Sequence, residues 1–384
     1  MDSLRSRAAM AVVLLLLTSF SCQRVVRGTA PDSPLAAVTE YGDPLPFVPG
    51  SFTLAVLPDT QVYCRAYPKH FYRQTKWIAK NRRRYAIPYV LHLGDVTDHN
   101  TPKQWRVARA AMRRLHGVVP YAMAPGNHDY GDNGRANSRQ TFLNYYFPLA
   151  RFARWPTFGG AMEDGRLDNS WHTFEANGNK FLILALEFGP RNEVVEWANR
   201  IVAQHPGYRV ILITHAYLYC DDTIYDWTEY GQKQKWNPYS YDTADLPGCT
   251  NDGIDLWNKL VRKHPDFMMV VSGHVLNDGL GYRKSTGDHG NVVHEMLVNY
   301  QMNTEGGEGF LRLIEFLPDG ETVQVKAYSP SLGQYKTDPQ NQFVLKLDPK
   351  LVVLQVVNDG YRKPGTGTSF PGASLRKAER AVRK

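Results

Sequence analysis

The sequence predicts an α/β fold in which two packed sheets carry helices on their outer faces. Over the first half of the chain, short apolar runs alternate with helical patterns, which is typical of a mostly parallel sheet. Further along, strand-like runs meet at Asn177-Gly178 and at Asp319-Gly320, and both dipeptides indicate antiparallel hairpins. The chain has 384 residues, of which 43% are hydrophobic, which is ample for one large core or two smaller ones.

The first half reads as strand, helix, strand, helix, strand. The strands are short apolar runs without helical periodicity. The second helix begins with a Thr101 cap and Pro102 at its first position, and it ends at Gly117. The expected elements are strand 51–58, helix 68–84, strand 87–95, helix 101–117 and strand 118–129.

The second half adds two more helix–strand units and closes with antiparallel strands. The expected elements are a hairpin in 171–188, helix 191–207, strand 208–215, helix 252–265, strand 266–274 and a hairpin in 309–330. Residues 216–251 form an insertion rich in Tyr, Trp, Asp and Pro. Its aromatic side chains either line a substrate cleft or form a satellite core, and a loop of this length in a compact domain is often functional.

The N-terminus predicts export. Residues 1–21 have a basic start, an apolar core and a small-x-small end, which is the pattern of a secretory signal peptide. Cys22 follows directly and suggests lipoprotein processing, although Ser19 stands where a lipobox has an aliphatic residue. The protein is therefore expected in the periplasm, on the cell surface or outside the cell, with a membrane contact only if Cys22 is lipidated. Residues 22–50 read as a Pro-rich linker.

The formal charge of +8 lies mostly at the end of the chain. Residues 360–384 carry a net charge of +6 in a flexible, Gly- and Pro-containing tail, and the signal segment contributes +1. The remaining body is close to neutral, which argues against a nucleic-acid partner. The sequence does not indicate an oligomeric state.

Five predicted strands end in a residue that binds metals. In open α/β sheets, ligands bind beyond the carboxyl ends of the strands, so these side chains are expected to converge at one edge. Glycines before several of them allow the sharp turns that this needs. The five residues are Asp59, Asp95, Asn127, His215 and His274.

These motifs, in this order, resemble those of the calcineurin-like metallophosphoesterases, and most closely an exported branch with an Asp-Thr-Gln first motif. The matching elements span roughly residues 52–300 and read DTQ, GDVTD, GNHD, THA and SGH. The resemblance implies a four-layer αββα sandwich with two divalent ions (Mn²⁺, Fe²⁺, Zn²⁺ or Mg²⁺) at the strand ends. It also implies a phosphoesterase domain over 51–304, completed by the antiparallel strands of 305–350.

The resemblance further implies that a hydroxide activated by the metals hydrolyses a phosphate mono- or diester of a small phosphorylated substrate. Asp95 would bridge the two ions. The remaining ligands of one ion would be Asn127, His215 and His274. His128 would face the leaving-group oxygen as a proton donor, with Asp129 or Asp98 available to orient it.

The chain departs from the family pattern at two positions. Gln61 stands at the usual histidine of the first motif, and Leu276 stands at the second histidine of the last motif. The ligands that remain for the first ion are Asp59 and Asp95, and Gln61 would be a weak ligand at best. Asn277 could replace the missing second histidine, although its spacing is wrong by one residue. This site is expected to be weak, to select harder cations, or to be empty. The alternative function is a degenerate member that binds a phosphorylated ligand or one cation without turnover.

The cysteines suggest one disulfide. Cys220 and Cys249 flank the insertion and are predicted to pair in an oxidising compartment. The alternative partner for either of them is Cys64, which follows the first motif.

Overall fold

The computed structural model describes residues 43–348 of the chain. The predicted signal peptide with Cys22, most of the Pro-rich linker and the basic tail lie outside these residues. Within 43–348, no helix is both long enough and apolar enough to cross a lipid bilayer.

The first sheet combines the N-terminal strands with the C-terminal ones. Its order is β13-β12-β11-β1-β2-β3, and β14 pairs with β12. The strands β1, β2 and β3 are parallel, whereas β11 runs antiparallel to β1. Their bounds are β1 Phe52–Leu57, β2 Tyr89–His92, β3 Tyr121–Met123, β11 Leu311–Phe316, β12 Thr322–Ser329, β13 Gln334–Lys336 and β14 Phe343–Lys346.

The second sheet comes from the middle of the chain. Its order is β4-β5-β6-β7-β8-β10-β9, in which β6, β7, β8 and β10 are parallel neighbours. The predicted hairpin at Asn177-Gly178 joins β5 to β6. The bounds are β4 Phe158–Ala161, β5 Ser170–Ala176, β6 Asn179–Leu186, β7 Arg209–Thr214, β8 Phe267–Ser272, β9 Leu280–Thr286 and β10 Val292–Val298.

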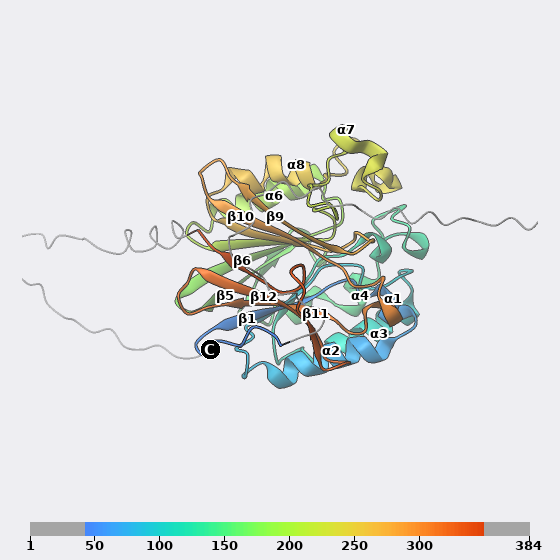
Figure 1. Ribbon diagram of the computed structural model, residues 1–384. Coiled ribbons are helices and arrows are strands. Elements are labelled where there is room, and N and C mark those ends of the chain that lie inside the picture. The colour runs from blue at the N-terminus through green and yellow to red at the C-terminus, as the bar shows by residue number, and fades with distance from the viewer. Residues whose placement is uncertain (1–42, 349–384) are drawn as a thin grey trace, which may run out of the picture.

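Helices cover the outer face of each sheet, as Figure 1 shows. The helices α2 (Pro68–Asn81) and α3 (Pro102–Met112) lie on the first sheet, and α6 (Asn192–Ala203) and α8 (Gly253–Lys259) lie on the second. The predicted four-layer αββα sandwich is therefore confirmed. Shorter helices are α1 Gln61–Arg65, α4 Leu143–Tyr146, α5 Leu149–Phe152, α7 Trp227–Tyr230 and α9 Thr304–Gly307. Turns of 3₁₀ helix span Asn127–Asp129, Asp132–Gly134, Gly231–Lys233, Pro238–Ser240, Asp242–Ala244 and Val261–Lys263.

The core has three layers because successive side chains of a strand point to opposite faces. In β1, Leu54 and Val56 belong to the layer between the two sheets, and Ala55 and Leu57 to the layer under α2 and α3. Burying one such Leu or Val side chain contributes about 1.5–3 kcal/mol. Both faces of β1 are thus sealed, and the ends of the central strands remain as places for a site.

The predicted helices are shorter in the structure, and one short helix was not predicted. The Thr101 hydroxyl does accept a hydrogen bond from Gln104 N, but α3 ends at Met112 and not at Gly117. Beyond Met112 the chain continues in tight turns, for example with Leu115 N on Met112 O, until Gly117 takes a φ of 77°. The short helix α1 directly after the first strand was not predicted.

Candidate metal centre

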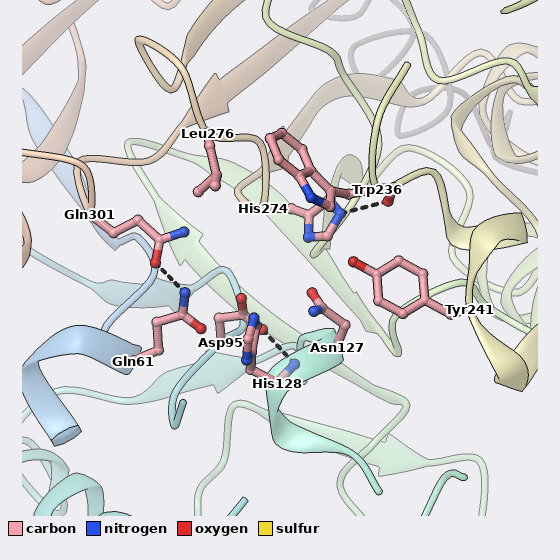
Figure 2. Close-up of a pocket in the computed structure, with 9 residues that line it drawn as sticks. All are labelled: Gln61, Asp95, Asn127, His128, Trp236, Tyr241, His274, Leu276 and Gln301. Carbon is pink, nitrogen blue, oxygen red and sulfur yellow. Dashed lines mark hydrogen bonds between the residues drawn. The ribbon is translucent and has the colours of Figure 1, made fainter. Parts of the chain in front are cut away.

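The strand ends converge as the sequence predicts. Asp59 follows β1, Asp95 follows β2, Asn127 follows β3, and His215 and His274 follow β7 and β8. One ligand atom each of Asp95, His215 and His274 lies within 4.8 Å of the others. Asn127 lines the same pocket (Figure 2), and the Asp59 carboxylate accepts a hydrogen bond from His274 N at 3.2 Å. All five side chains are buried.

Two glycines make this close approach possible. A Cβ atom on Gly126 would lie 2.1 Å from Asp95 Oδ1, and one on Gly94 would lie 2.7 Å from His215 Nδ1. Gly94 also has a φ of 103°, which favours glycine. Asp95 and His274 adopt positive φ values of 46° and 76° without being glycine, a strain that the surrounding contacts hold in place.

Backbone carbonyls fix the tautomers of both histidines. His215 Nδ1 donates to Leu93 O at 2.9 Å, and His274 Nε2 donates to Trp236 O at 2.8 Å. When each ring is neutral, its opposite nitrogen therefore carries the lone pair and can bind a metal. Among the described residues, His215 Nε2 and Asn127 Oδ1 are buried without a hydrogen-bond partner. Two imidazole nitrogens, an amide oxygen and the Asp95 carboxylate form a donor set that fits a divalent cation.

The electrostatics of the cluster also favour positive charge. Burial opposes the ionised Asp95 carboxyl, but the imidazoles of His215 and His128 hold its pKa below the usual range. Burial raises the pKa of Asp59 to about 7, with His215 opposing this and Asp95 adding to it. Burial disfavours a charged His215, yet Asp95 and Asp59 raise its pKa to about 9. A proton on His215 and a cation would therefore compete for the same place beside Asp95.

His128 is held by its main chain and by its ring. Its backbone N donates to Asp95 Oδ1 at 2.9 Å, and its Nδ1 donates to Asp98 O at 2.8 Å. The Asp98 carboxylate in turn contacts Arg65 at 2.6 Å and His99 at 3.1 Å. The His128 side chain is 34% exposed and lines the pocket, which leaves its Nε2 available there.

Of the two residues expected to orient His128, Asp129 is engaged elsewhere. Its carboxylate accepts hydrogen bonds from the backbone N atoms of Val96, Thr97 and Gly126 at 2.8–3.0 Å. Together with the Thr97 hydroxyl, these donors occupy both of its oxygens. Asp129 therefore ties the loop after β2 to the loop after β3, and Asp98 is the residue that orients the His128 ring.

A model of the calcineurin-like phosphoesterases matches residues 52–278, more than half of the chain. The chain belongs to the calcineurin-like phosphoesterase family. The predicted family is therefore confirmed, and it is a family of metal-dependent phosphoric ester hydrolases.

The chain is also similar to several individual proteins. The chain is 30% identical over 330 residues to the uncharacterized protein YvnB of Bacillus subtilis, a match that covers 83% of the chain. The chain spans only 23% of the length of that relative. Among solved structures, it is similar to purple acid phosphatase PPD1 from yellow lupin, with a TM-score of 0.47, 15% identity, and 81% and 56% of the two chains covered. A dimetal phosphatase from Danio rerio gives a TM-score of 0.45 and 13% identity, with 77% and 99% covered.

The positions at which the chain departs from the family pattern lie at one side of the pocket. Gln61 and Leu276 both line it (Figure 2). Asn277 is exposed, and its Nδ2 donates to Cys220 Sγ at 3.1 Å. The suggestion that Asn277 replaces the missing histidine is therefore wrong, because its side chain is engaged outside the pocket.

Two polar residues of the centre escaped the sequence analysis. Gln301 lines the pocket and accepts a hydrogen bond from Gln61 Nε2, and Asn299 Nδ2 donates to Asp59 Oδ2 at 2.9 Å. Both follow β10, whose apolar run 292–298 shows the same strand-end pattern that identified the other site residues. The signal was present in the sequence.

The insertion contributes side chains both to the core and to the lining of the pocket. Tyr217 and Tyr225 are fully buried in the core that includes α6 and α8. Trp236 and Tyr241 line the pocket, which has a volume of about 80 Å³. Trp236 also supplies the carbonyl that orients His274, and it does so with a φ of 63°.

The predicted disulfide between Cys220 and Cys249 is not formed, and within 43–348 no cysteine pair is bridged. Cys220 is buried and accepts the hydrogen bond from Asn277. The end of the insertion is held instead by Arg139, which donates to the carbonyls of Cys249 and Gly189. Cys64, the alternative partner, is buried in the layer under α2 and α3.

Proposed function

We propose that the protein hydrolyses a phosphate mono- or diester in a reaction that depends on divalent cations. The observation that carries this proposal is the pair of buried atoms without a hydrogen-bond partner among the described residues, His215 Nε2 and Asn127 Oδ1, beside the Asp95 carboxylate. Leaving such groups unsatisfied costs about 1–3 kcal/mol each, and a bound cation removes that cost.

Each ligand role follows from the donor atoms. Asn127, His215 and His274 would hold one ion, and Asp59 would hold the other. Asp95 would bridge them, since a carboxylate has two oxygens that face different partners. When bound, two divalent ions supply Lewis-acid charge for the phosphate and lower the pKa of water toward about 7.

His128 supports the role of proton donor. With Nδ1 on the Asp98 carbonyl, the protonated ring presents Nε2–H to the pocket. As the ester P–O bond breaks, this proton goes to the leaving oxygen, so that an alcohol and not an alkoxide departs. The Arg65–Asp98 contact keeps the supporting loop in place.

The size of the pocket bears on the substrate. A phosphate group would fit in this pocket of about 80 Å³, and the rest of a larger substrate would extend past its rim. Trp236, Tyr241 and Leu276 border that space and would contact the organic part of the ester.

Export is proposed on the signal pattern of residues 1–21, and lipidation of Cys22 stays open. Cell fractionation of a tagged chain tests both points. Recovery of unprocessed protein with the cytosolic markers would contradict export, and labelling by a fatty-acid analogue that Cys22→Ser abolishes would establish lipidation.

The activity is tested on the chain without residues 1–21. Chelator treatment should abolish hydrolysis of p-nitrophenyl phosphate or of its bis-ester, and added Mn²⁺ should restore it. Equal rates with and without metal would refute the proposal. Metal binding without turnover of either ester would favour the alternative of a binding protein.

A further inference from the structure

The two halves of the metal centre offer different donor atoms. On the side of β7 and β8, His215 and His274 contribute nitrogen beside the amide oxygen of Asn127. On the side of β1, the chain has the carboxylates of Asp59 and Asp95, with Gln61 in place of an imidazole. Leu276, also on this side, has no donor atom.

Gln61 is oriented as an oxygen donor. Its side chain is buried, and its Nε2 donates to Gln301 Oε1. Its Oε1 is buried and has no hydrogen-bond partner among the residues described. Figure 2 shows the nitrogen turned to Gln301 and the oxygen turned toward the side of Asp95. An amide oxygen facing a carboxylate is repulsive, unless a cation lies between them.

Gln301 is linked by hydrogen bonds to the Asp59 carboxylate. Its backbone N donates to Asn299 Oδ1 at 2.9 Å, and Asn299 Nδ2 donates to Asp59 Oδ2 at 2.9 Å. Asn299 is held further by the Val275 carbonyl at 3.3 Å. A continuous set of hydrogen bonds therefore runs from Asp59 through Asn299 and Gln301 to the Gln61 amide.

We propose that Asp59, Asp95 and Gln61 Oε1 form an all-oxygen cation site, in which Gln301 is the positioning residue that keeps the Gln61 oxygen turned inward. Oxygen donors suit Mg²⁺ and Mn²⁺, whereas imidazole suits Zn²⁺. The centre thus holds two cations of different preference, a borderline one on the histidine side and a harder one on the glutamine side. This inference rests on the proposed function, because it assigns the second ion of the same site.

The test reads metal binding and not activity. The stripped chain without residues 1–21 is loaded with one equivalent of Zn²⁺ and titrated with Mn²⁺, followed by the loss of the free-Mn²⁺ spin resonance signal. The unmodified chain should bind one Mn²⁺ beside the Zn²⁺, and Mg²⁺ should compete for it. Gln301→Leu should weaken Mn²⁺ binding by about 10–100-fold, the usual effect of removing an outer-shell partner, while the Zn²⁺ stays bound.

Matched variants separate positioning from stability. Gln301→Glu keeps an acceptor for Gln61 Nε2 and should restore Mn²⁺ binding. Gln324→Leu removes an equally buried glutamine from β12, outside the pocket, and should leave Mn²⁺ binding unchanged. Gln61→His should raise the preference of this side for Zn²⁺ over Mn²⁺ by about tenfold or more. If Gln301→Leu does not fold, Gln61→Leu removes the proposed ligand directly and should lose the Mn²⁺.

Unchanged Mn²⁺ affinity in Gln301→Leu or Gln61→Leu would overturn the inference, as would an unchanged Zn²⁺ to Mn²⁺ preference in Gln61→His. Failure of this cation assignment can be distinguished from failure of the proposed function. A chain that binds both ions as described and hydrolyses neither ester refutes the function alone. A chain that hydrolyses an ester with its Mn²⁺ affinity insensitive to Gln61 and Gln301 refutes the cation assignment alone.

Discussion

Replacing Gly126 with alanine should disable the centre without touching any proposed ligand. The φ of Gly126 is −96°, which any residue adopts, so the change introduces no backbone strain of its own. The added Cβ would lie 2.1 Å from Asp95 Oδ1 and 2.3 Å from Asp95 N, whereas ordinary contacts begin at 3.4 Å. The Asp95 carboxylate, which both ions would share, must therefore move by more than about 1 Å.

We expect Gly126→Ala to lower the free energy of unfolding by about 1–3 kcal/mol, as other overpacked buried sites do. Turnover should fall by about 10²-fold, because a displacement of this size spoils the alignment of the reacting groups. Denaturant unfolding and initial rates measure these two effects, and elemental analysis measures how much metal the variant retains. Gly281→Ala is the milder control, since its Cβ would meet its nearest atoms at 3.2 Å, which a shift of a few tenths of an ångström relieves. Full metal content with normal turnover in Gly126→Ala would refute the reasoning.

Four further predictions address the ligands, protons and stability. His128→Ala should keep its metal and lose about 10²–10⁴-fold in turnover, whereas His215→Ala should lose both; metal loss in His128→Ala would contradict this division. The pKa of His215 is raised to about 9, so metal binding at pH 7.5 should displace a proton from its ring, and metal affinity should fall as the pH falls. Calorimetry in two buffers of different ionisation enthalpy measures the proton release. No release would show that the ring is already neutral. After metal loading and dialysis, the unmodified protein should retain nearer one ion than two, and Gln61→His should raise that number; two equally tight ions would show an additional ligand on the Asp59 side. Burial opposes the charge of Glu187, but Arg139 and Arg191 hold its pKa below the usual range, so its contribution to stability is present above the unfolded-state pKa and is lost as pH falls through the folded-state pKa. Glu187→Gln should remove that part of the acid destabilisation, measured by denaturant unfolding at several pH values.

The fold and the five strand-end residues were predictable because their cause is local and periodic. An apolar run followed by Gly-Asp or Gly-His specifies a strand that ends in a ligand-type side chain, and parallel order brings those ends together. The same rule applied to 292–298 would have found Asn299 and Gln301. They were missed because no family motif covers that strand end.

The errors concern which partner a side chain selects, and adjacent residues compete for that choice. Asp129 follows His128 in sequence, yet the free N–H groups of two neighbouring loops surround its carboxylate. Asn277 stands next to the expected ligand position, but a φ of 63° turns it toward Cys220. Residue spacing does not reveal either preference, because Val96 and Thr97 in one case and Cys220 in the other are distant in the sequence.

The main chain and the side chain of Trp236 have different roles in the site. Its carbonyl holds a metal-site imidazole, a task that any amino acid able to adopt this backbone conformation could perform, while its indole borders the space where the substrate would lie. Transplanting the insertion from a relative would thus disturb the metal unless that carbonyl came with it. Changing only the side chain at this position would alter which esters fit and leave the ions in place, so new substrate preferences can arise here without passing through an inactive protein.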